Sequence, residues 1–368
     1  MKVMVVGGGS MGRRRLRDLT YLNPGGVLLL EPVAERCEQV SKSFGVPGYT
    51  DVEKAFGEKP HALVVSTPPA LHDQYVKRGV NKGKSVFAEV PFLLDYNDLK
   101  QVAETAAKKN PKPVLGVSHT IRYYPPYRLI RDLLDQRVIG KPLYLEYSLG
   151  NYLPDWHPYE DYRKFYASDQ KLGGAGMDML LHELSAIHWW LGPSAKILSR
   201  LAKVSSLEIK GPDTHDILIR FENGAVGFFH HDVIERGTVG RHIRIVGEEG
   251  TIEWHQNQST IRVYHGKENR NDEIGFDKAS DWEQAMEASR EASKLVAAQR
   301  AASGQIPAAT APSFTYESCY VREMRHYLNA VAGKTPYTGC TIEEELKTVA
   351  TFHAVLTSAE QGREVSIT

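Results

Sequence analysis

The sequence predicts an α/β fold with two domains, and three observations support this prediction. The first 120 residues alternate short apolar runs with amphipathic helical patterns, which is typical of a doubly wound parallel sheet. Later segments are mostly strands joined by turns, which favours an α+β domain with a large, open, mostly antiparallel sheet. The chain has 368 residues, more than one hydrophobic core usually organises. We therefore expect one domain over residues 1–122 and a second over residues 123–368.

The N-terminal elements follow one another as strand, helix, strand. A β-branched run, "KVMVV", leads into a glycine cluster and then into a helical pattern, and later segments repeat this order. Asp95 stands where an N-cap is expected for the last of these helices. The predicted strands are 2–6, 26–32, 61–69, 84–91 and 113–119, and the predicted helices are 10–22, 34–44, a short one within 49–56, 70–83 and 95–109.

The turn after the first strand has the pattern G-x-G-x-x-G, which within this alternation predicts a Rossmann dinucleotide site. Glycines allow the tight turn, the approach of a pyrophosphate to the backbone and close packing of helix on strand. Glu31 ends the second strand, 31 − 12 = 19 residues past the last glycine, where a carboxylate can bind the ribose hydroxyls of the adenosine. The cofactor residues predicted from this motif are Gly7, Gly9, Ser10, Met11, Gly12 and Glu31.

The acidic residue also bears on the choice of cofactor. Glu31 should repel a 2′-phosphate, so NAD is expected. NADP stays an alternative, because Arg13 or Arg36 could compensate that charge. The run "RRRLR" itself is interpreted as a solvated helix face.

The second half reads as a sheet made of hairpins. Strand patterns cover 143–150, 195–206, 214–234, 241–255 and 259–265, with turn signals at Asn223-Gly224 and Glu249-Gly250. A sheet of this kind, open on one face, commonly buries its other face on helices or on another subunit.

One helix, within residues 172–192, interrupts these strands. Asp178 and His182 are four residues apart, so both lie on one helical face. A carboxylate beside an imidazole can orient the ring for general acid/base catalysis, although a histidine on a helix rich in Leu and Met is more often a core residue.

Two further segments were assigned from their composition. Residues 151–163 combine aromatic rings with polar groups, including Trp156, His157, Tyr162 and Arg163, which suits a sugar-like ligand or, alternatively, a subunit contact or a structural loop. Residues 266–312 are rich in Ala, Ser, Glu, Lys and Gln and are expected to be an insertion, such as a lid or an oligomer arm.

The overall composition narrows the class of partner. Lys+Arg and Asp+Glu are both 45 and the pI is about 7.3, so no nucleic-acid partner is expected. No leader peptide and no run of ~18 apolar residues is evident, which predicts a cytoplasmic protein without a membrane partner. Three widely spaced cysteines argue against disulfides and structural zinc, and no metal is expected, because His and acidic residues do not cluster at ligand spacing. With these partners excluded, we expect a small-molecule substrate.

Taken together, "VVGGGSMGRRRLRDL", "VVSTPPALH", "GKSVFAEVP", "IRYYP", "GGAGMDMLLHEL" and "IVGEEGTIEW" resemble the Gfo/Idh/MocA oxidoreductases, in the same order along the chain. This resemblance implies a Rossmann domain and an α/β domain whose open sheet associates into a homodimer or homotetramer. It also implies oxidation or reduction of sugars, inositols or related compounds with NAD(P).

The resemblance also implies roles for single residues. His182 matches the histidine that acts as acid/base, and Asp178 matches a substrate-binding aspartate one turn before it. Ser66, Thr67, Pro68 and His72 would line the nicotinamide end of the cofactor, Glu89 and Val90 would lie beside it, and Thr120, Arg122 and Tyr123 would lie where cofactor and substrate meet.

One position departs from the family pattern. "AEVP" stands where the family usually has Glu-Lys-Pro, and Val90 has neither the charge nor the donor of that lysine. Three interpretations follow: an NAD(P)-dependent dehydrogenase or reductase in which His182 carries the proton, a reductase of an already polarised double bond, or a nucleotide-binding sensor or partner protein without catalysis. We favour the first.

Overall fold

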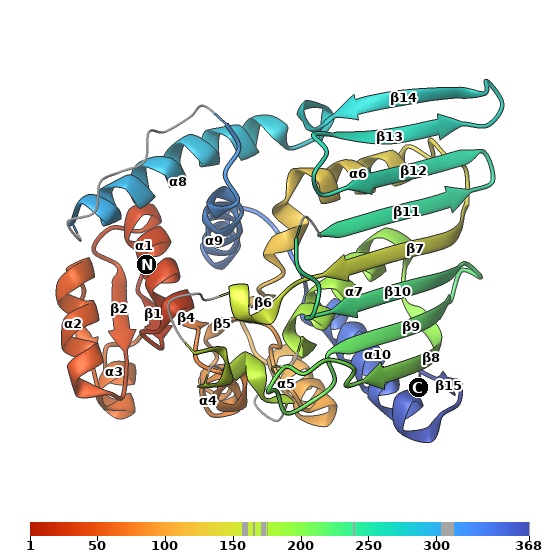
Figure 1. Ribbon diagram of the computed structural model, residues 1–368. Helices are drawn as coiled ribbons and strands as arrows, with labels where there is room; N and C mark the ends of the chain where they lie inside the picture. Colours follow the sequence, from red (N-terminus) through yellow and green to blue (C-terminus); the bar gives the residue numbers. More distant parts are fainter. Residues whose placement is uncertain are drawn as a thin grey trace. The chain divides into compact units, whose positions relative to one another are not determined.

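The computed structural model describes residues 1–156, 161–164, 166–170, 174, 176–237, 240–302 and 313–367, without the side chains of Asp178 and Ala302 (Figure 1). The chain forms two compact units. The first contains residues 1–123 and 283–345, and the second contains residues 124–282 and 346–368.

The first unit is built on a six-stranded parallel sheet with strand order β3-β2-β1-β4-β5-β6. Its strands are β1 (Val3–Val6), β2 (Val27–Leu30), β3 (Gly48–Tyr49), β4 (Ala62–Val65), β5 (Ser85–Ala88) and β6 (Leu115–Val117). Its helices are α1 (Ser10–Leu22), α2 (Ala34–Phe44), α3 (Val52–Gly57), α4 (His72–Asn81), α5 (Tyr96–Ala107), α8 (Trp282–Ala302) and α9 (Glu317–Val331). This sheet order confirms the predicted doubly wound fold.

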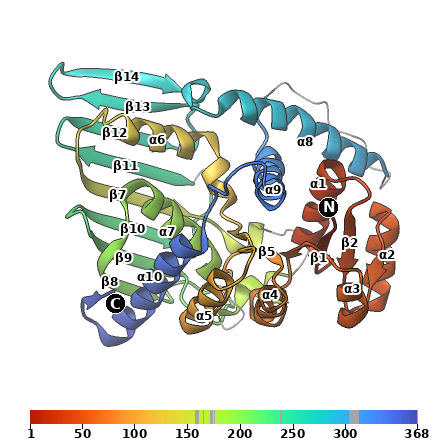
Figure 2. The same ribbon diagram turned by 180° about the vertical axis from the view of Figure 1, so that it is seen from behind.

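Burial on both sheet faces explains why these strands read as continuous apolar runs. All four residues of β1 and of β4 are buried. Figures 1 and 2 show α1 and α9 on one face and α4 and α5 on the other. Met324, Tyr327 and Leu328 of α9 join the same core, although they follow the sheet by about two hundred residues in the sequence. Asp95 caps α5 as expected, since its carboxylate accepts from Asp98 N at 2.9 Å.

The second unit is built on a nine-stranded sheet with strand order β14-β13-β12-β11-β7-β10-β9-β8-β15. Its strands are β7 (Pro142–Gly150), β8 (Ser194–Ala202), β9 (Thr214–Phe221), β10 (Val226–Asp232), β11 (Arg241–Gly247), β12 (Gly250–His255), β13 (Thr260–His265), β14 (Arg270–Gly275) and β15 (Val365–Ser366). The β7–β10 pair is parallel and the other pairs are antiparallel, so the predicted mostly antiparallel sheet is confirmed.

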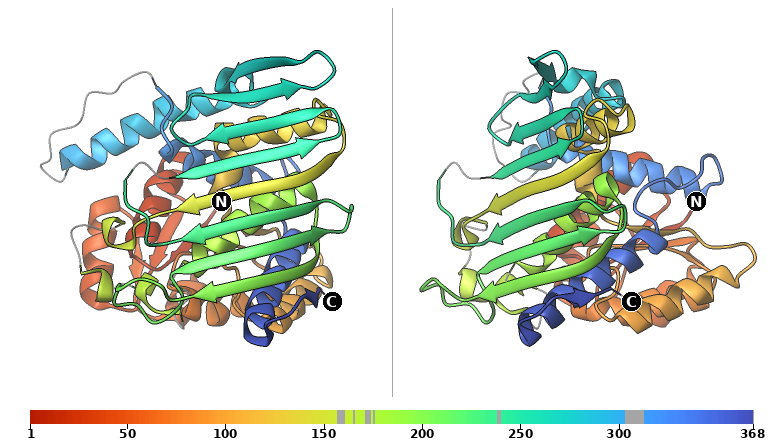
Figure 3. Two further views of the ribbon diagram at one scale, coloured as in Figure 1. Left: turned by 45° about the vertical axis from the view of Figure 1, so that its right-hand side comes forward. Right: turned by 90° about the vertical axis from the view of Figure 1, so that its right-hand side faces the viewer.

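Helices of this unit cover one face of the sheet. They are α6 (Pro125–Asp135), α7 (Met177–Leu191) and most of α10 (Ile342–Gln361). Figure 3 shows the other face open, with no helix of this unit across it in the described part of the chain. Along β9, buried Ile217 and Ile219 alternate with exposed Leu218 and Arg220, as expected for a sheet that packs on one side.

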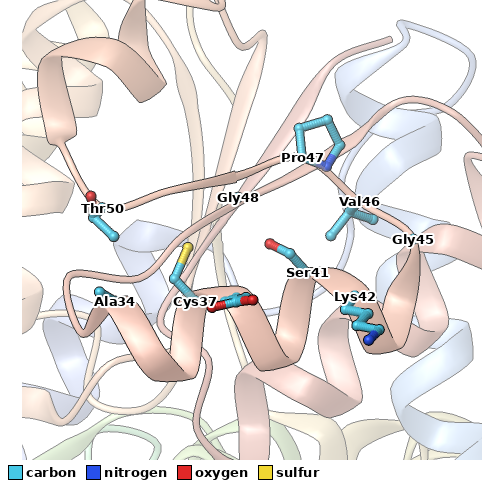
Figure 4. A pocket seen from close by; sticks show the side chains of 10 residues that line it. Ala34, Cys37, Ser41, Lys42, Gly45, Val46, Pro47, Gly48 and Thr50 are labelled. Atoms are coloured by element: carbon cyan, nitrogen blue, oxygen red, sulfur yellow. The ribbon is translucent and has the colours of Figure 1, made fainter.

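Two remaining features concern the surface. An open hollow of about 740 Å³ lies over α2 and the segment that leads to β3, lined by residues such as Cys37, Ser41 and Thr50 (Figure 4). None of the predicted cofactor residues lines it. Among the described residues, no helix is both long enough and apolar enough to span a bilayer.

Candidate functional site

The glycine turn lies between β1 and α1 in the first unit. Gly7 has φ +98°, and a Cβ there would lie 2.9 Å from Ser66 O. A Cβ on Gly12 would lie 1.9 Å from Gly7 O, so neither position accepts a side chain. At Gly9, by contrast, a Cβ would meet no described atom within 4 Å. Gly9 is also the N-cap of α1 and makes no side-chain cap hydrogen bond, which leaves the helix N-terminus open to an anion such as a pyrophosphate.

Glu31 is anchored directly beside this turn. Its carboxylate is buried and accepts hydrogen bonds from Gly8 N at 2.8 Å and from Val33 N at 2.9 Å. Arg36 approaches the same carboxylate at 3.4 Å, and Arg13 donates to Gly8 O at 3.2 Å. The two arginines considered for a 2′-phosphate therefore flank the turn, while Glu31 is held in place by the backbone.

A buried ion network lies behind the end of β5. Arg15 donates to Glu89 from Nε at 2.7 Å and from Nη2 at 3.1 Å, and its Nη2 also lies 2.9 Å from Glu323 and 2.6 Å from Ser118 Oγ. Arg15 is fully buried and Arg17 is nearly so. The interpretation of "RRRLR" as a solvated helix face is therefore wrong for these two arginines.

The electrostatics of this network follow from burial and pairing. Burial alone would raise the pKa of Glu89, but the Arg15 guanidinium outweighs it and lowers that pKa below its usual range. Burial raises the pKa of Glu323 to about 7, and the nearby charge of Glu89 adds to that effect while Arg15 opposes it. Arg15 thus holds Glu89 as a carboxylate, at the position predicted to lie beside the cofactor.

The other predicted nicotinamide residues lie around this network. His72 is fully buried, and its ring nitrogens lie 2.8 Å from Thr67 O and 2.8 Å from Pro91 O, so the ring ties two loops together. Ser66 lies 3.4 Å from Glu89. Pro68 precedes a 3₁₀ turn over Pro69–Leu71. Val90 is 6% exposed and precedes a cis peptide bond to Pro91.

After β6, the four residues Thr120–Tyr123 form a 3₁₀ turn that is bonded to later parts of the first unit. Thr120 donates to Glu323 at 3.2 Å, and Arg122 forms an ion pair with Glu344 at 2.8 Å. The Tyr123 hydroxyl lies 2.8 Å from His326 Nδ1. The side chains of Thr120, Arg122 and Tyr123 thus each contact a partner within the first unit.

In the second unit, α7 carries the predicted catalytic pair. His182 is half-buried on this helix, and Asp178 lies one turn before it, with its side chain outside the described part. Gly176 caps the helix with φ +79°, and a Cβ there would lie 2.6 Å from His231 Cε1.

The strands beneath this helix end carry two buried histidines that the sequence did not single out. His215 on β9 and His231 on β10 are fully buried, with their rings stacked at a centroid distance of 5.1 Å. Burial lowers the pKa of His215 to about 4 and the pKa of His231 well below its usual value. Both rings are therefore neutral near pH 7.

A second buried group surrounds Glu183, the neighbour of His182. Arg241 pairs with Glu183 at 2.7 Å, and the hydroxyls of Tyr127 and Tyr147 donate to the same carboxylate at 2.9 and 2.5 Å. Because Glu183 is fully buried and satisfied, it fixes α7 against β7 and β11.

In the segment 151–163, the described residues Trp156, Tyr162 and Arg163 make contacts within the second unit. Trp156 and Tyr162 pack against a small apolar cluster of Leu153, Ala167 and Val233. Arg163 is exposed and pairs with Asp161 and Glu208. His157 lies outside the described residues.

Comparison with known proteins identifies the family. Residues 1–117 match the model of an oxidoreductase family with an NAD-binding Rossmann fold, and residues 131–367 match the C-terminal α/β domain of the same family. The chain belongs to the Gfo/Idh/MocA oxidoreductase family. The expected family and the NAD-binding character of the first unit are thereby confirmed.

The relatives of this chain that are named for a specific activity share low sequence identity with it. The scyllo-inositol 2-dehydrogenase (NAD(+)) of Bacillus subtilis is 25% identical over 262 residues, which cover 68% of this chain and 73% of that protein. Several other curated relatives are matched over less of their own length, from 27% to 61%.

Solved structures of Gfo/Idh/MocA type share the fold over the whole chain. Levoglucosan dehydrogenase in complex with NADH has a TM-score of 0.79 at 18% identity, covering 100% of this chain and 99% of that one. An oxidoreductase from Agrobacterium radiobacter in complex with NAD+, L-tartaric acid and magnesium has a TM-score of 0.79 at 19% identity, covering 100% and 98%.

Proposed function

We propose that this protein transfers a hydride between NAD(P) and a hydroxyl or carbonyl carbon of a sugar, nucleotide sugar or related polyol. The observation that carries the proposal is the turn at Gly7 to Gly12, where neither Gly7 nor Gly12 has room for a side chain and Glu31 is anchored to Gly8 N. The nicotinamide, when bound, supplies the hydride chemistry. NAD is preferred, and NADP is the alternative that Arg13 and Arg36 would serve.

Cofactor contacts are assigned along the first unit. Gly9, Ser10 and Met11 would bind the pyrophosphate at the N-terminus of α1, and Glu31 would bind the adenosine ribose. Ser66, Thr67, Pro68, His72 and Glu89 would form or support the nicotinamide end.

His182 would move the proton. In the oxidative direction it accepts the hydroxyl proton as the hydride leaves the same carbon, and in the reductive direction it returns that proton to the carbonyl oxygen. Asp178, one turn earlier on α7, would orient the ring or hold a neighbouring hydroxyl. Val90 is apolar and 6% exposed, so it offers no donor in place of the family lysine, and the proton step rests on His182.

The substrate class is the least direct part of the proposal. It is supported by relatives that act on inositols and by a structural neighbour named for levoglucosan. Thr120, Arg122, Tyr123, Trp156, His157, Tyr162 and Arg163 are the proposed substrate residues. Residues 1–122 are proposed as the dinucleotide-binding domain and residues 123–368 as the substrate and oligomerisation domain.

The open sheet face is proposed as the site of self-association into a homodimer or homotetramer. It carries exposed Leu198, Leu218 and Val226 on neighbouring strands β8, β9 and β10. Such apolar side chains on an uncovered face favour burial against a second copy. A reducing compartment, such as the cytoplasm, is proposed because Cys37, Cys319 and Cys340 are buried as free thiols.

The test begins with fluorescence titrations of nucleotide-free protein with NADH and NADPH, followed by a polyol and sugar screen. We expect micromolar binding of NADH, weaker binding of NADPH, and turnover with at least one polyol. His182→Ala should lower kcat by ~10²–10⁴-fold and leave NADH affinity nearly unchanged. His188→Ala is the matched control, because His188 lies on the same helix but bonds Ser194 Oγ at 2.9 Å, and it should retain turnover.

Other outcomes select other functions. Nucleotide binding with turnover only on compounds that have a polarised double bond would favour the lysine-independent reductase. Binding without any turnover would favour a sensor or partner protein. An apo sample that binds neither nucleotide would overturn the oxidoreductase proposal.

A further inference from the structure

A group of three potential metal ligands lies on the open face of the nine-stranded sheet. His242 is on β11, and Glu253 and His255 are on the neighbouring strand β12. Strand pairing places His242 directly opposite His255, and Glu253 is two residues before His255, on the same face. These three residues are not clustered along the chain, which is why no metal was expected from the sequence, but strand pairing brings them together in space.

The donor atoms of these residues converge. His242 Nε2 lies 3.2 Å from Glu253 Oε1, and His255 Nε2 lies 3.7 Å from the same oxygen. All three donor atoms lie within 4.8 Å of one another. A tetrahedral zinc ion with bonds of about 2.0–2.1 Å holds its ligand atoms roughly 3.3 Å apart, so small side-chain shifts suffice.

The two rings and the carboxylate meet at one oxygen atom. The His242 and His255 rings are nearly parallel, 7° apart with centroids at 4.0 Å, and the Nε2 atom of each lies near Glu253 Oε1. Because the lone pair of an imidazole nitrogen lies in the ring plane, the two rings turn toward each other when they share one ion. The other oxygen of Glu253, Oε2, pairs with Arg262, which fixes the carboxylate and leaves Oε1 toward the imidazoles. In metal sites, the ligand side chains are commonly oriented by hydrogen bonds from residues that do not touch the metal, and Arg262 would do this for Glu253.

Another histidine on the same face provides a contrast. His230 on β10 also lies between carboxylates, with Nδ1 at 2.7 Å from Asp216 and Nε2 at 3.1 Å from Asp232. Both of its ring nitrogens are thus already paired with anions, and among the described residues it belongs to no group of three convergent metal-ligand atoms. His230 therefore forms ion pairs with Asp216 and Asp232. In contrast, His242, Glu253 and His255 offer three convergent metal-donor atoms.

We propose that His242, Glu253 and His255 bind a borderline divalent transition metal of the Zn²⁺ class. Two imidazoles and one carboxylate are a donor set that zinc accepts, and three protein ligands leave a fourth position for water. The ion joins β11 to β12 on the face without helices. This site is independent of the hydride chemistry, because it uses none of the residues assigned to it.

The test uses the tag-free full chain, stripped with chelator and titrated with Zn²⁺ by calorimetry. We expect one ion per chain, with affinity lowered at least tenfold by His242→Asn and by His255→Asn, and less by Glu253→Gln. His230→Asn is the matched control and should not change the affinity. Zinc should also raise Tm in the parent and in the control, but not in the His242→Asn variant.

A second measurement separates this site from a thiol site. Cobalt(II) bound by histidine and carboxylate shows visible ligand-field bands without an intense near-ultraviolet thiolate band. That thiolate band would instead place the ion at Cys340, which lies near His119 and Glu345. Zinc affinity that is unchanged in both histidine variants, or the thiolate band, would overturn the proposal.

Discussion

His231 Nδ1 lies 3.2 Å from His215 Nδ1, and both imidazoles are fully buried under the N-terminus of α7. His215 Nδ1 also lies 3.3 Å from His231 O, a carbonyl that can only accept. This assigns the Nδ1 hydrogen to His215 and makes His231 Nδ1 an acceptor, so neutral His231 carries its hydrogen on Nε2. Neither Nε2 has a hydrogen-bond partner among the described residues, so the pair presents one donor and one acceptor beside Gly176.

The contact of this pair with the helix end predicts a steric effect of Gly176→Ala. A Cβ there would lie 2.6 Å from His231 Cε1, whereas at Gly362, φ +63°, it would meet nothing within 4 Å. Gly176→Ala and Gly362→Ala both place a side chain at a positive φ, which should lower the free energy of unfolding by about 1–2 kcal/mol. Only Gly176→Ala also overpacks a buried site, which should lower it by about 1–3 kcal/mol more. Urea unfolding of the two variants measures this difference, and equal losses of stability would contradict the packing.

The same histidines predict a loss of stability in acid. Their pKa values are lower in the folded chain than the ~6.5 of an unfolded histidine, so the unfolded state binds more protons as the pH falls below that value. Stability is therefore fully present above about pH 6.5 and falls toward the folded pKa of His215, about 4. The slope should reach about 1.4 kcal/mol per pH unit for each histidine. Replacing both by Asn should flatten the slope between pH 6.5 and 5, whatever the change in overall stability.

His230 predicts the opposite dependence. Its hydrogen bond to Asp232 is the largest cause that raises its pKa, to about 9, and Asp216 adds to it against the effect of burial. A raised folded pKa gives stability that is fully present below about pH 6.5 and is lost as the pH rises through 9. Denaturant titrations at pH 7, 8, 9 and 10 should show this loss in the parent chain. His230→Asn should remove it, and a parallel decline in the variant would refute the assignment.

The buried network at Arg15 predicts a large effect of its removal. Arg15→Ala leaves Glu89 and Glu323 facing each other without a cation, which should cost about 3–5 kcal/mol of folding stability. Arg15→Lys keeps the charge and should fold if the alanine variant does not, but it should weaken NADH binding because one amine cannot reproduce the paired contacts to Glu89. Arg13→Ala is the matched control on the same helix and should cost below about 1 kcal/mol. Equal losses from both arginines would show that the network is not what stabilises this end of β5.

Much of the fold could be predicted because its signals are local. Apolar runs, helical periodicity, the Asp95 cap and the glycine turn each depend on residues close in sequence, and each is observed. The return of α9 to the first unit could not be predicted in this way. Met324 and Tyr327 pack on strands more than two hundred residues earlier, and an amphipathic helix does not specify which sheet it covers.

The candidate site shows the same limit. Glu31 was predicted from its spacing, but its bonds to Gly8 and Val33 depend on the geometry of the turn. Arg15 looked like a surface residue because its partner Glu323 lies 308 positions away. The signal that could have been used is the arginine's place on the sheet-facing side of α1, four residues before buried Leu19.

Position 90 predicts a change of chemistry when its valine is replaced by lysine. The side chain is 6% exposed and follows Glu89, whose carboxylate is already paired with Arg15. Val90→Lys adds an ammonium that can donate to a reacting oxygen and share the proton step with His182. We expect the rate of turnover to change by tenfold or more and the pH profile of kcat to gain a second ionisation. Val90→Met adds similar length without a charge and should keep the parent pH profile, so an identical profile in both variants would mean that position 90 plays no part in the proton transfer.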